Sequence, residues 1–290
     1  MRGRGLGISA AGETEVKPIF TAHLLPVVET RLLELLRSLT PPEWELQTVA
    51  PEWKVKDVAA HLLDTQLRKL SRVRDGCVPE PRPQFASHDE LIAFVNRLNH
   101  EGVEMYRRLS PAVLISMMQV ASSEYAAFHQ GLDPMAEARF GVSWAGEDRS
   151  LNWFDTAREL TERWHHQQQI RFATNRPGIM TRELYYPVLD CFMRALPFKY
   201  RDRTAPSGSH LQFNVSGECG GSWYLYRDGD RWRQVESPQG QQLSETTISQ
   251  DIAWRLFTKG IGREAAASAV TVTGDRDLGS HVVSMVAIIG

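Results

Sequence analysis

The segment ARELTERWHHQQQIRFA contains the residues with the clearest chemical potential in this chain. Glu162 and His166 are four residues apart, and on a helix that spacing places both side chains on one face, close enough to share an ion. A carboxylate and an imidazole are ordinary ligands of zinc and of other divalent transition metals. His165 lies three residues after Glu162, so spacing alone leaves the choice between the two histidines open.

A third ligand must come from another segment, because two ligands on one helix seldom hold a metal. His61 lies in VKDVAAHLLDTQL, between Val58 and Leu62, on the side of a helix that is expected to face the protein interior. Two histidines and one carboxylate leave metal positions open for water or substrate, as in catalytic sites. These residues therefore predict one divalent ion, most simply zinc, with nickel or iron as alternatives.

Each of these residues also has an ordinary structural explanation. A histidine near an apolar face is more often a satisfied residue of the core or its rim, and Glu and His four apart occur by chance on solvated helix faces. The chain contains no HExxH motif that would sharpen the metal hypothesis.

The composition of the 290-residue chain argues against several other classes of function. The formal net charge is −2 without a basic cluster, so nucleic acid is not an expected partner. No apolar run approaches the ~20 residues of a membrane span, and the first residues lack the apolar stretch of a secretory signal. Cys77, Cys191 and Cys219 are far apart and odd in number, which is typical of free thiols in a reducing compartment. We expect a cytoplasmic monomer or homodimer with small-molecule partners and no membrane.

Helices are needed to position the three residues, and helical periodicity runs from about residue 18 to 200. Apolar residues recur every three or four positions, and they predict helices over 25–39, 54–75, the residues after Ser87, 152–173 and 181–200. Residues 111–132 are apolar and Met-rich, which indicates shorter helices. Residues 1–17 are Gly-rich without periodicity and predict a flexible tail.

The composition of the sequence changes near Arg201, where the polar segment RDRTAPSGSH, with its Pro and Gly, predicts a domain boundary. After it, LQFNVSG, SWYLYRDGDRWRQVE and AVTVTGD have the pattern of strands, and Asp228-Gly229 predicts a hairpin turn. Residues 248–258 and 280–289 have helical patterns. The fold class predicted is α plus α+β: a metal-binding helical bundle over 18–200 and a smaller α+β domain over 201–290.

Several segments resemble a known family. PEWKVKDVAAHLLD, which contains His61, resembles a motif of the DinB-like superfamily and, more closely, of the mycothiol-dependent maleylpyruvate isomerase N-terminal domain. ERWHHQQQIR is similar to that family's E-x-x-x-H motif. GSWYLYRDGDRW, DIAWRLFTKGI and VTVTGDRDL resemble its second domain, of sterol-carrier-like shape. The resemblance covers roughly residues 20–290 and implies a DinB-like four-helix bundle.

The resemblance also implies a ligand set and an activity. The family's metal ligands fall on His61, Glu162 and His166, which favours His166 over His165. The family often has Asp three residues after the second histidine, whereas this chain has Gln169. The implied activity is that of a metal-dependent enzyme. It would use a low-molecular-weight thiol such as mycothiol, as an isomerase or a thiol S-transferase acting on an electrophilic small molecule.

Both reactions need a cation near the anionic end of the electrophile. Arg255 and Lys259, in or just after the helix predicted over 248–258, are the catalytic candidates, and Arg263 follows them. Their ordinary interpretation is that of solvated surface charges. Two other functions stay open, namely a metal or ligand carrier without turnover and metal-assisted hydrolysis. No GxSxG segment or other signature of a covalent nucleophile is present.

Overall fold

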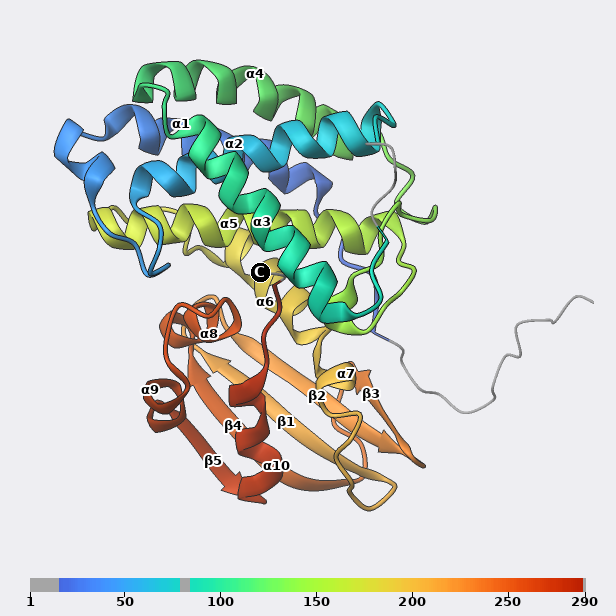
Figure 1. Ribbon diagram of the computed structural model, residues 1–290. Coiled ribbons are helices and arrows are strands. Elements are labelled where there is room, and N and C mark those ends of the chain that lie inside the picture. The colour runs from blue at the N-terminus through green and yellow to red at the C-terminus, as the bar shows by residue number, and fades with distance from the viewer. Residues whose placement is uncertain (1–15, 79–83, 289–290) are drawn as a thin grey trace, which may run out of the picture.

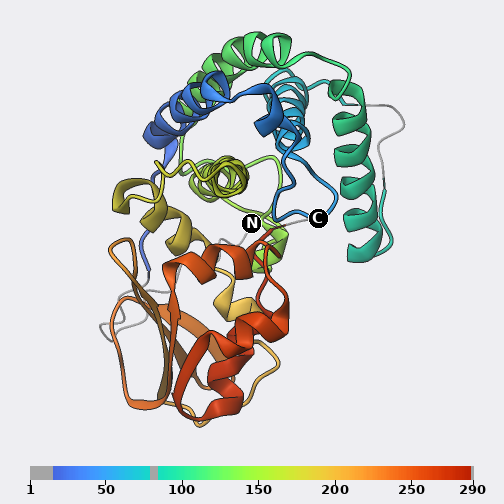
Figure 2. The ribbon, with the colours of Figure 1, turned by 90° about the vertical axis from the view of Figure 1, so that its left-hand side faces the viewer.

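The computed structural model describes residues 16–78 and 84–288, and it places a helical region beside a five-stranded sheet (Figure 1). Four long helices pack around a common interior: α1 and α2 each contact both α4 and α5. The additional helix α3 packs on α2 and stands apart from the others (Figure 2). Their bounds are α1 Leu25–Ser38, α2 Val55–Lys69, α3 His88–Tyr106, α4 Pro111–Gln130 and α5 Asn152–Thr174. None of the described helices is long and apolar enough to cross a membrane.

Two helices of the helical region differ from the sequence prediction. Residues 111–130 form one continuous helix, α4, rather than shorter pieces, because Ser110 caps its start and Pro111 stands in the first turn, where no backbone donor is needed. The helix predicted over 181–200 is divided into α6 (Arg182–Met193) and α7 (Leu196–Lys199). The division falls at residues 194–195, and α6 continues through Pro187.

The sheet has the strand order β3-β2-β1-β4-β5. The β1 strand pairs antiparallel with β2 and parallel with β4, and the hairpin between β2 and β3 turns at Gly229, whose φ is +56°. This confirms the predicted hairpin, with the turn at Gly229-Asp230, one residue later than predicted, because Asp228 still pairs with Arg231. The strand bounds are β1 Ser209–Ser216, β2 Gly221–Asp228, β3 Arg231–Val235, β4 Gln241–Ser249 and β5 Val270–Gly274.

The β4 strand was absent from the sequence prediction because its inward residues are mostly small and polar. Thr246 is buried and donates to the carbonyl of Gly279, which belongs to the short helix α10 (Arg276–Ser280). A Cβ added at Gly279 would lie 2.9 Å from the Thr246 hydroxyl and 2.4 Å from Val272, so the helix lies directly on the strand. At this inward position the Thr246 hydroxyl bonds the backbone that packs against it, so the apolar side chain that a strand pattern predicts is absent.

The predicted helix over 248–258 is confirmed as α8 (Gln250–Phe257), and a short helix, α9 (Arg263–Ser268), follows it. The helix predicted over 280–289 is wrong within the described residues. The chain makes a short 3-10 helix, His281–Ser284, and is then extended. The extended segment is held by a hydrogen bond from Ala287 N to Phe257 O, and Met285 and Ala287 are buried against the core.

One hydrophobic core runs from the helical region into the sheet. The Trp164 indole on α5 stacks on Tyr185 of α6 with ring centroids 4.3 Å apart, and it meets Trp254 of α8 edge-on. Tyr185 also donates its hydroxyl to the carbonyl of Gln250, at the start of α8. The helical and sheet regions therefore share buried aromatic side chains, while the predicted boundary at 200/201 stays a prediction.

The predicted flexible tail, residues 1–17, lies outside the described residues as far as residue 15. Its last two residues contact the rest of the chain. The carbonyls of Val16 and Lys17 accept hydrogen bonds from Arg194, at the end of α6.

A buried polar cluster joins the four long helices next to the predicted ligands. The Arg163 guanidinium on α5 forms a two-point ion pair with Glu29 of α1 and donates to the Leu62 carbonyl of α2 at 2.6 Å. Gln66 of α2 and Ser122 of α4 donate to the same Glu29 carboxylate at 2.9 and 2.6 Å. We call these five residues the Glu29 cluster. Since Leu62 follows His61 and Arg163 follows Glu162, the cluster fixes the two ligand helices relative to each other.

The Glu29 cluster generates a prediction about stability. Arg163→Met should lower the free energy of unfolding by about 3–5 kcal/mol, because it leaves the Glu29 carboxylate buried without its cation. Arg31→Met, which breaks an exposed ion pair with Glu34 on the same helix as Glu29, should cost less than about 1 kcal/mol. Urea unfolding of both variants measures the difference. Equal costs would show that the cluster does not stabilise the fold.

Candidate metal centre

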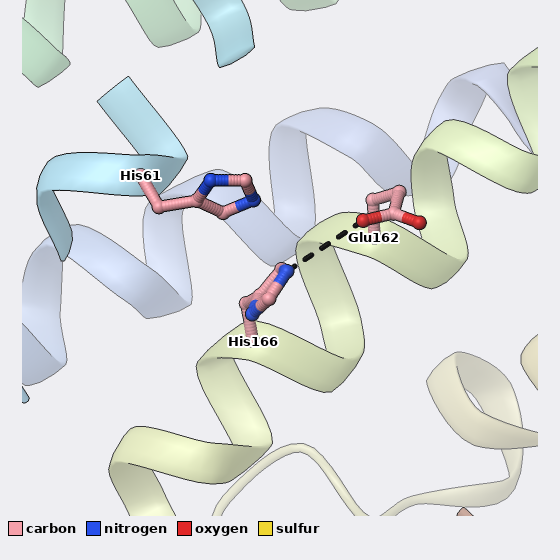
Figure 3. Close-up of side chains that lie close together, drawn as sticks. All are labelled: His61, Glu162 and His166. Carbon is pink, nitrogen blue, oxygen red and sulfur yellow. Dashed lines mark ion pairs between the residues drawn. The ribbon is translucent and has the colours of Figure 1, made fainter. Parts of the chain in front are cut away.

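The structure brings His61, Glu162 and His166 together from two helices (Figure 3). Each residue offers one ligand atom, and these atoms all lie within 4.8 Å of one another. Nε2 of His166 is 3.6 Å from a carboxylate oxygen of Glu162, and the His61 ring points into the space between them. In a tetrahedral zinc site the donor atoms lie about 3.3–3.6 Å apart, given metal–ligand bonds of about 2.0–2.2 Å. The separations of the ligand atoms are therefore within about 1.5 Å of those that a metal needs.

His61 is held as a neutral imidazole, which is the form that binds metals. It is buried on α2, and this burial, followed by the charges of His166 and Arg68, lowers its pKa well below the ordinary histidine value. Its Nδ1 is buried and has no hydrogen-bond partner among the described residues. A buried imidazole nitrogen without a hydrogen-bond partner is consistent with a side chain that binds a metal ion.

Trp53 forms an aromatic wall beside the two histidines. Its ring centroid is 4.6 Å from that of His61 and 5.8 Å from that of His166. The loop that carries it is tied back on itself, since the Trp53 carbonyl accepts from Gln47 Nε2, Thr48 Oγ1 and Thr48 N. A rigid apolar face at this place limits the access of water to the imidazoles.

Glu162 lies on the open side of the group. Its side chain is 24% exposed, whereas that of His166 is 9% exposed. Burial raises the pKa of the Glu162 carboxyl, but the hydrogen bond with His166 and the positive charges nearby outweigh it, so the pKa lies below the ordinary value. The carboxylate is therefore ionised at neutral pH, as a metal ligand must be.

His166 is oriented by a residue that the sequence left without a role. Its Nδ1 lies 2.9 Å from the side-chain oxygen of Gln169, one helical turn later. With the proton on Nδ1 donated to this oxygen, Nε2 carries the lone pair and faces Glu162 and His61. Gln169 is the residue that the resemblance marked as a departure from the family pattern, and its amide oxygen can fix the tautomer of His166.

His165 points elsewhere, although its ring is 3.9 Å from that of His166. Its Nδ1 lies 2.8 Å from the carbonyl of Thr161, so the ring turns back along its own helix. Burial lowers the pKa of His165 to about 3, and the histidine therefore stays neutral. The converging group of the described structure includes His166 and not His165.

The two predicted cations are not part of this converging group. The Arg255 guanidinium lies 5.3 Å from the ring centroid of Phe172 and donates to the carbonyl of Asp251. Phe172 comes six residues after His166, which places it on a different side of α5. Lys259 is exposed beyond the end of α8, with a φ of +61°.

Other cations lie nearer the predicted ligands. The charge of Arg68 lowers the pKa of His61, and that of Arg158 lowers the pKa of Glu162. Arg68 is bound by Asp64 and Asn99, at 2.7 Å each, and its side chain is 25% exposed. Arg158 is paired with Asp155 and Glu159.

Sequence reasoning did not find the supporting residues Trp53, Arg163 and Glu29, and it named Gln169 only as a departure from the family pattern. Trp53 lies within the segment that carries the resemblance, so its proximity to His61 had a signal in the sequence. An arginine at position 163 on the buried side of an apolar helix was a weaker signal. Nothing in the local sequence links it to Glu29, which is 134 positions away.

Comparisons with known proteins agree with this architecture. The fold and the site define a class: helical-bundle proteins with an inward-facing His–Glu–His group and a C-terminal sheet domain. The family described as mycothiol maleylpyruvate isomerase N-terminal domain matches residues 25–171, about half of the chain, and includes all three converging residues. The chain belongs to this family.

Two solved structures are similar to most of the chain. A crystal structure of a mutant of the mycothiol-dependent maleylpyruvate isomerase has a TM-score of 0.50 and 13% sequence identity, covering 87% of this chain and 91% of its own. A second structure of that isomerase has a TM-score of 0.47 with the same identity and coverage. The first similarity confirms the predicted fold class, with a helical N-terminal region and a C-terminal α+β region. No curated protein matches the chain.

The geometry predicts which histidine a metal requires. Wild-type protein should bind about one zinc ion per chain, and His166→Ala should lose it, because two remaining ligands cannot enclose the ion. His165→Ala should keep its metal, since that ring is turned toward Thr161. Elemental analysis of the three proteins after zinc loading measures the difference. Metal retained by His166→Ala and lost by His165→Ala would move the site to the other histidine.

Gln169 generates a second prediction. Gln169→Leu keeps the size of the side chain but removes the oxygen that accepts from His166, so zinc affinity should fall by about 10–100-fold. Gln169→Glu supplies an acceptor again and should retain tight binding. Competition titration with a chromogenic chelator measures both affinities. Equal affinities of Gln169→Leu and wild type would remove Gln169 from the site.

Proposed function

We propose that this protein is an enzyme that uses a low-molecular-weight thiol, of the mycothiol type, to act on a small electrophile. His61, Glu162 and His166 would hold a divalent metal, most simply zinc, for this purpose. The observation that carries the proposal is the convergence of their ligand atoms within 4.8 Å, from two helices, in a chain of the mycothiol maleylpyruvate isomerase N-terminal domain family.

A divalent ion held by these residues supplies the positive charge that keeps a coordinated thiol deprotonated at neutral pH. The chain's own residues provide the conditions for this chemistry. His61 and His166 are presented as neutral donors, and Gln169 holds the ring of His166 in place. Trp53 covers the two imidazoles on one side, so thiol and electrophile would enter on the side where Glu162 is exposed.

Isomerisation is the reaction that the family favours. The thiolate sulfur adds to one carbon of an alkene conjugated to a carbonyl, and the π electrons move onto that carbonyl as an enolate. Rotation about the resulting single bond and expulsion of the thiolate restore the alkene in its trans form, and the thiol is regenerated. Transfer of the thiol onto an electrophile with a leaving group uses the same first step and is the alternative within this proposal.

Two pairs of cations can meet the anionic end of the electrophile. The sequence proposes Arg255 and Lys259. The structure adds Arg68 and Arg158, whose charges act on the proposed ligands. We propose Arg68 for this role, because it is partly exposed near His61, whereas Arg255 lies against Phe172.

The sheet region would support the loop of Trp53 rather than close over the metal as a lid. A Cβ added at Gly260, just after α8, would lie 3.3 Å from a methyl carbon of Val49. Val49 and Trp53 belong to the same loop, so α8 packs beside the wall of the proposed site.

The proposal is tested by a turnover assay on full-length, zinc-loaded protein. Mycothiol, glutathione and bacillithiol are each supplied with maleylpyruvate, and chromatography follows both the trans isomer and any thioether. We expect turnover with mycothiol that requires the metal and disappears in His166→Ala. A filled metal site without turnover of any thiol would contradict the proposal and favour hydrolysis or a binding function.

The same assay separates the proposed cations. Arg68→Met should raise the KM for an anionic electrophile by about tenfold and leave metal content unchanged, because it removes a charge-assisted contact with the substrate. Arg255→Met should change KM little. The reverse result would assign the role to the C-terminal helix.

A further inference from the structure

A cavity of about 710 Å³ lies at the other end of the α2–α5 seam from the proposed metal centre. It is bounded by the residues directly after α2, the start of α3, the end of α4 and the loop that joins α4 to α5. Its volume falls within the range of small-molecule sites, about 300–1,000 Å³. Its walls are formed by Arg72, Val73, Val78, Phe85, Phe94, Phe128, Leu132, Glu137, Ala138, Arg139, Phe140 and Asn152.

The cavity is separate from the site of the proposed function. Asn152 lines it, and Glu162 is ten positions further along α5, which corresponds to about 15 Å. A closed ionic layer lies between the two places, where Lys69 of α2 binds Asp155 at 2.6 Å and Glu159 at 3.1 Å. A small molecule in the cavity therefore does not reach the predicted metal ligands.

The charge of the cavity is positive and uncompensated. Arg72 and Arg139 form no ion pair with any carboxylate in the described part of the chain, and Nε of Arg72 is buried without a hydrogen-bond partner. Burial lowers the pKa of Arg72, and the charges of Arg68 and Arg139 lower it further. The only carboxylate among the lining residues, Glu137, is occupied by a two-point ion pair with Arg149. Two guanidinium groups thus face the same space without an anion.

The rest of the wall is aromatic. Phe85 and Phe94 lie with ring centroids 5.1 Å apart, and the Arg72 guanidinium lies 6.0 Å from the ring centroid of Phe140. Phe85 is 39% and Phe140 is 47% exposed, although neighbouring core positions bury their large side chains. Exposed aromatic rings around a hollow are typical of a surface that is covered when a ligand binds.

We propose that this cavity binds a small amphipathic anion: an apolar body, aromatic or acyl, that carries a single carboxylate, sulfonate or phosphate. The apolar body lies between the phenylalanine rings, and the anionic group accepts hydrogen bonds from Arg72 and Arg139. Arginine favours such a ligand because its planar fork matches the oxygens of a carboxylate or a phosphate. The anion removes the repulsion between the two guanidinium groups and satisfies the buried Nε. The inference does not depend on the metal centre.

The test compares two ligands that share one apolar body. Calorimetric titration of the full-length protein with 1-naphthoate should give saturable binding of one equivalent, and the neutral 1-naphthamide should bind at least about tenfold more weakly. Laurate and phenyl phosphate are the other arms, and they distinguish an acyl body from an aromatic one and a carboxylate from a phosphate. Equal binding of naphthoate and naphthamide would overturn recognition of an anion. Absence of saturable binding by every anion would overturn the site.

Variants locate the binding. Arg72→Met should weaken naphthoate binding by at least about tenfold without changing the binding of naphthamide. The control is Arg37→Met. Arg37 is a surface arginine of α1 that is bonded to Gln119 of α4, so this variant should bind both ligands as the wild type does. Leu132→Trp fills the cavity without altering either arginine, and it should weaken both ligands. Thermal melting of each variant verifies the fold. Naphthoate binding that survives both Arg72→Met and Leu132→Trp in folded protein would place the ligand elsewhere and overturn the proposal.

Discussion

The buried ion pair between Arg163 and Glu29 is the constraint on which the position of the candidate site depends. Arg163 reaches across the interior to Glu29 and the carbonyl of Leu62, and Gln66 and Ser122 complete the coordination of the carboxylate. A buried charge pair is weak evidence for added stability, since desolvation offsets much of its attraction, but it is demanding in geometry. An apolar contact in its place would tolerate sliding of α5 along α2. The hydrogen bond from Arg163 to the Leu62 carbonyl prevents such sliding, because it links the residue after Glu162 to the residue after His61.

Besides the Glu29 cluster, three further polar groups follow one another along the seam between α2 and α5. His61, Glu162 and His166 form the first group, and Lys69, Asp155 and Glu159 form the second. The cavity with Arg72 and Asn152 is the third. The ionic layer in the middle is closed on itself and neutralised by Arg158, so it insulates the two ends from each other. One helix pair can therefore carry two sites with different chemistry, because each is positioned by the same backbone and separated by a satisfied polar layer.

The sequence predicted what depends on local pattern. The helix over 152–173 was predicted from its periodicity, and the separation of four residues between Glu162 and His166 follows from the helix itself. The resemblance of two short segments paired His61 with that helix. The Glu29–Arg163 contact was beyond sequence reasoning, because it joins residues 134 positions apart and nothing in the local sequence links them. The β4 strand was missed for a physical reason of its own, since its Thr246 bonds the backbone of α10 in place of an apolar contact. The end of the chain was assigned to a helix on apolar content, whereas Met285 and Ala287 alternate toward the core as an extended segment does.

The residue at position 169 shows how a departure from a family pattern can retain one property and change another. Gln169 accepts a hydrogen bond from His166 Nδ1 through its amide oxygen, so the tautomer and the orientation of the ring are fixed. The charge differs, because an aspartate there would add a negative charge beside the ligands and would raise the basicity of the imidazole. With a neutral partner, the negative charge of the ligand set comes from Glu162 alone. A divalent ion held by such a set would keep more of its positive charge for an incoming ligand, and it would favour the deprotonated form of a thiol more strongly. We infer that Gln169 shifts the proposed site toward stronger activation of the thiol, at the cost of weaker electrostatic retention of the ion.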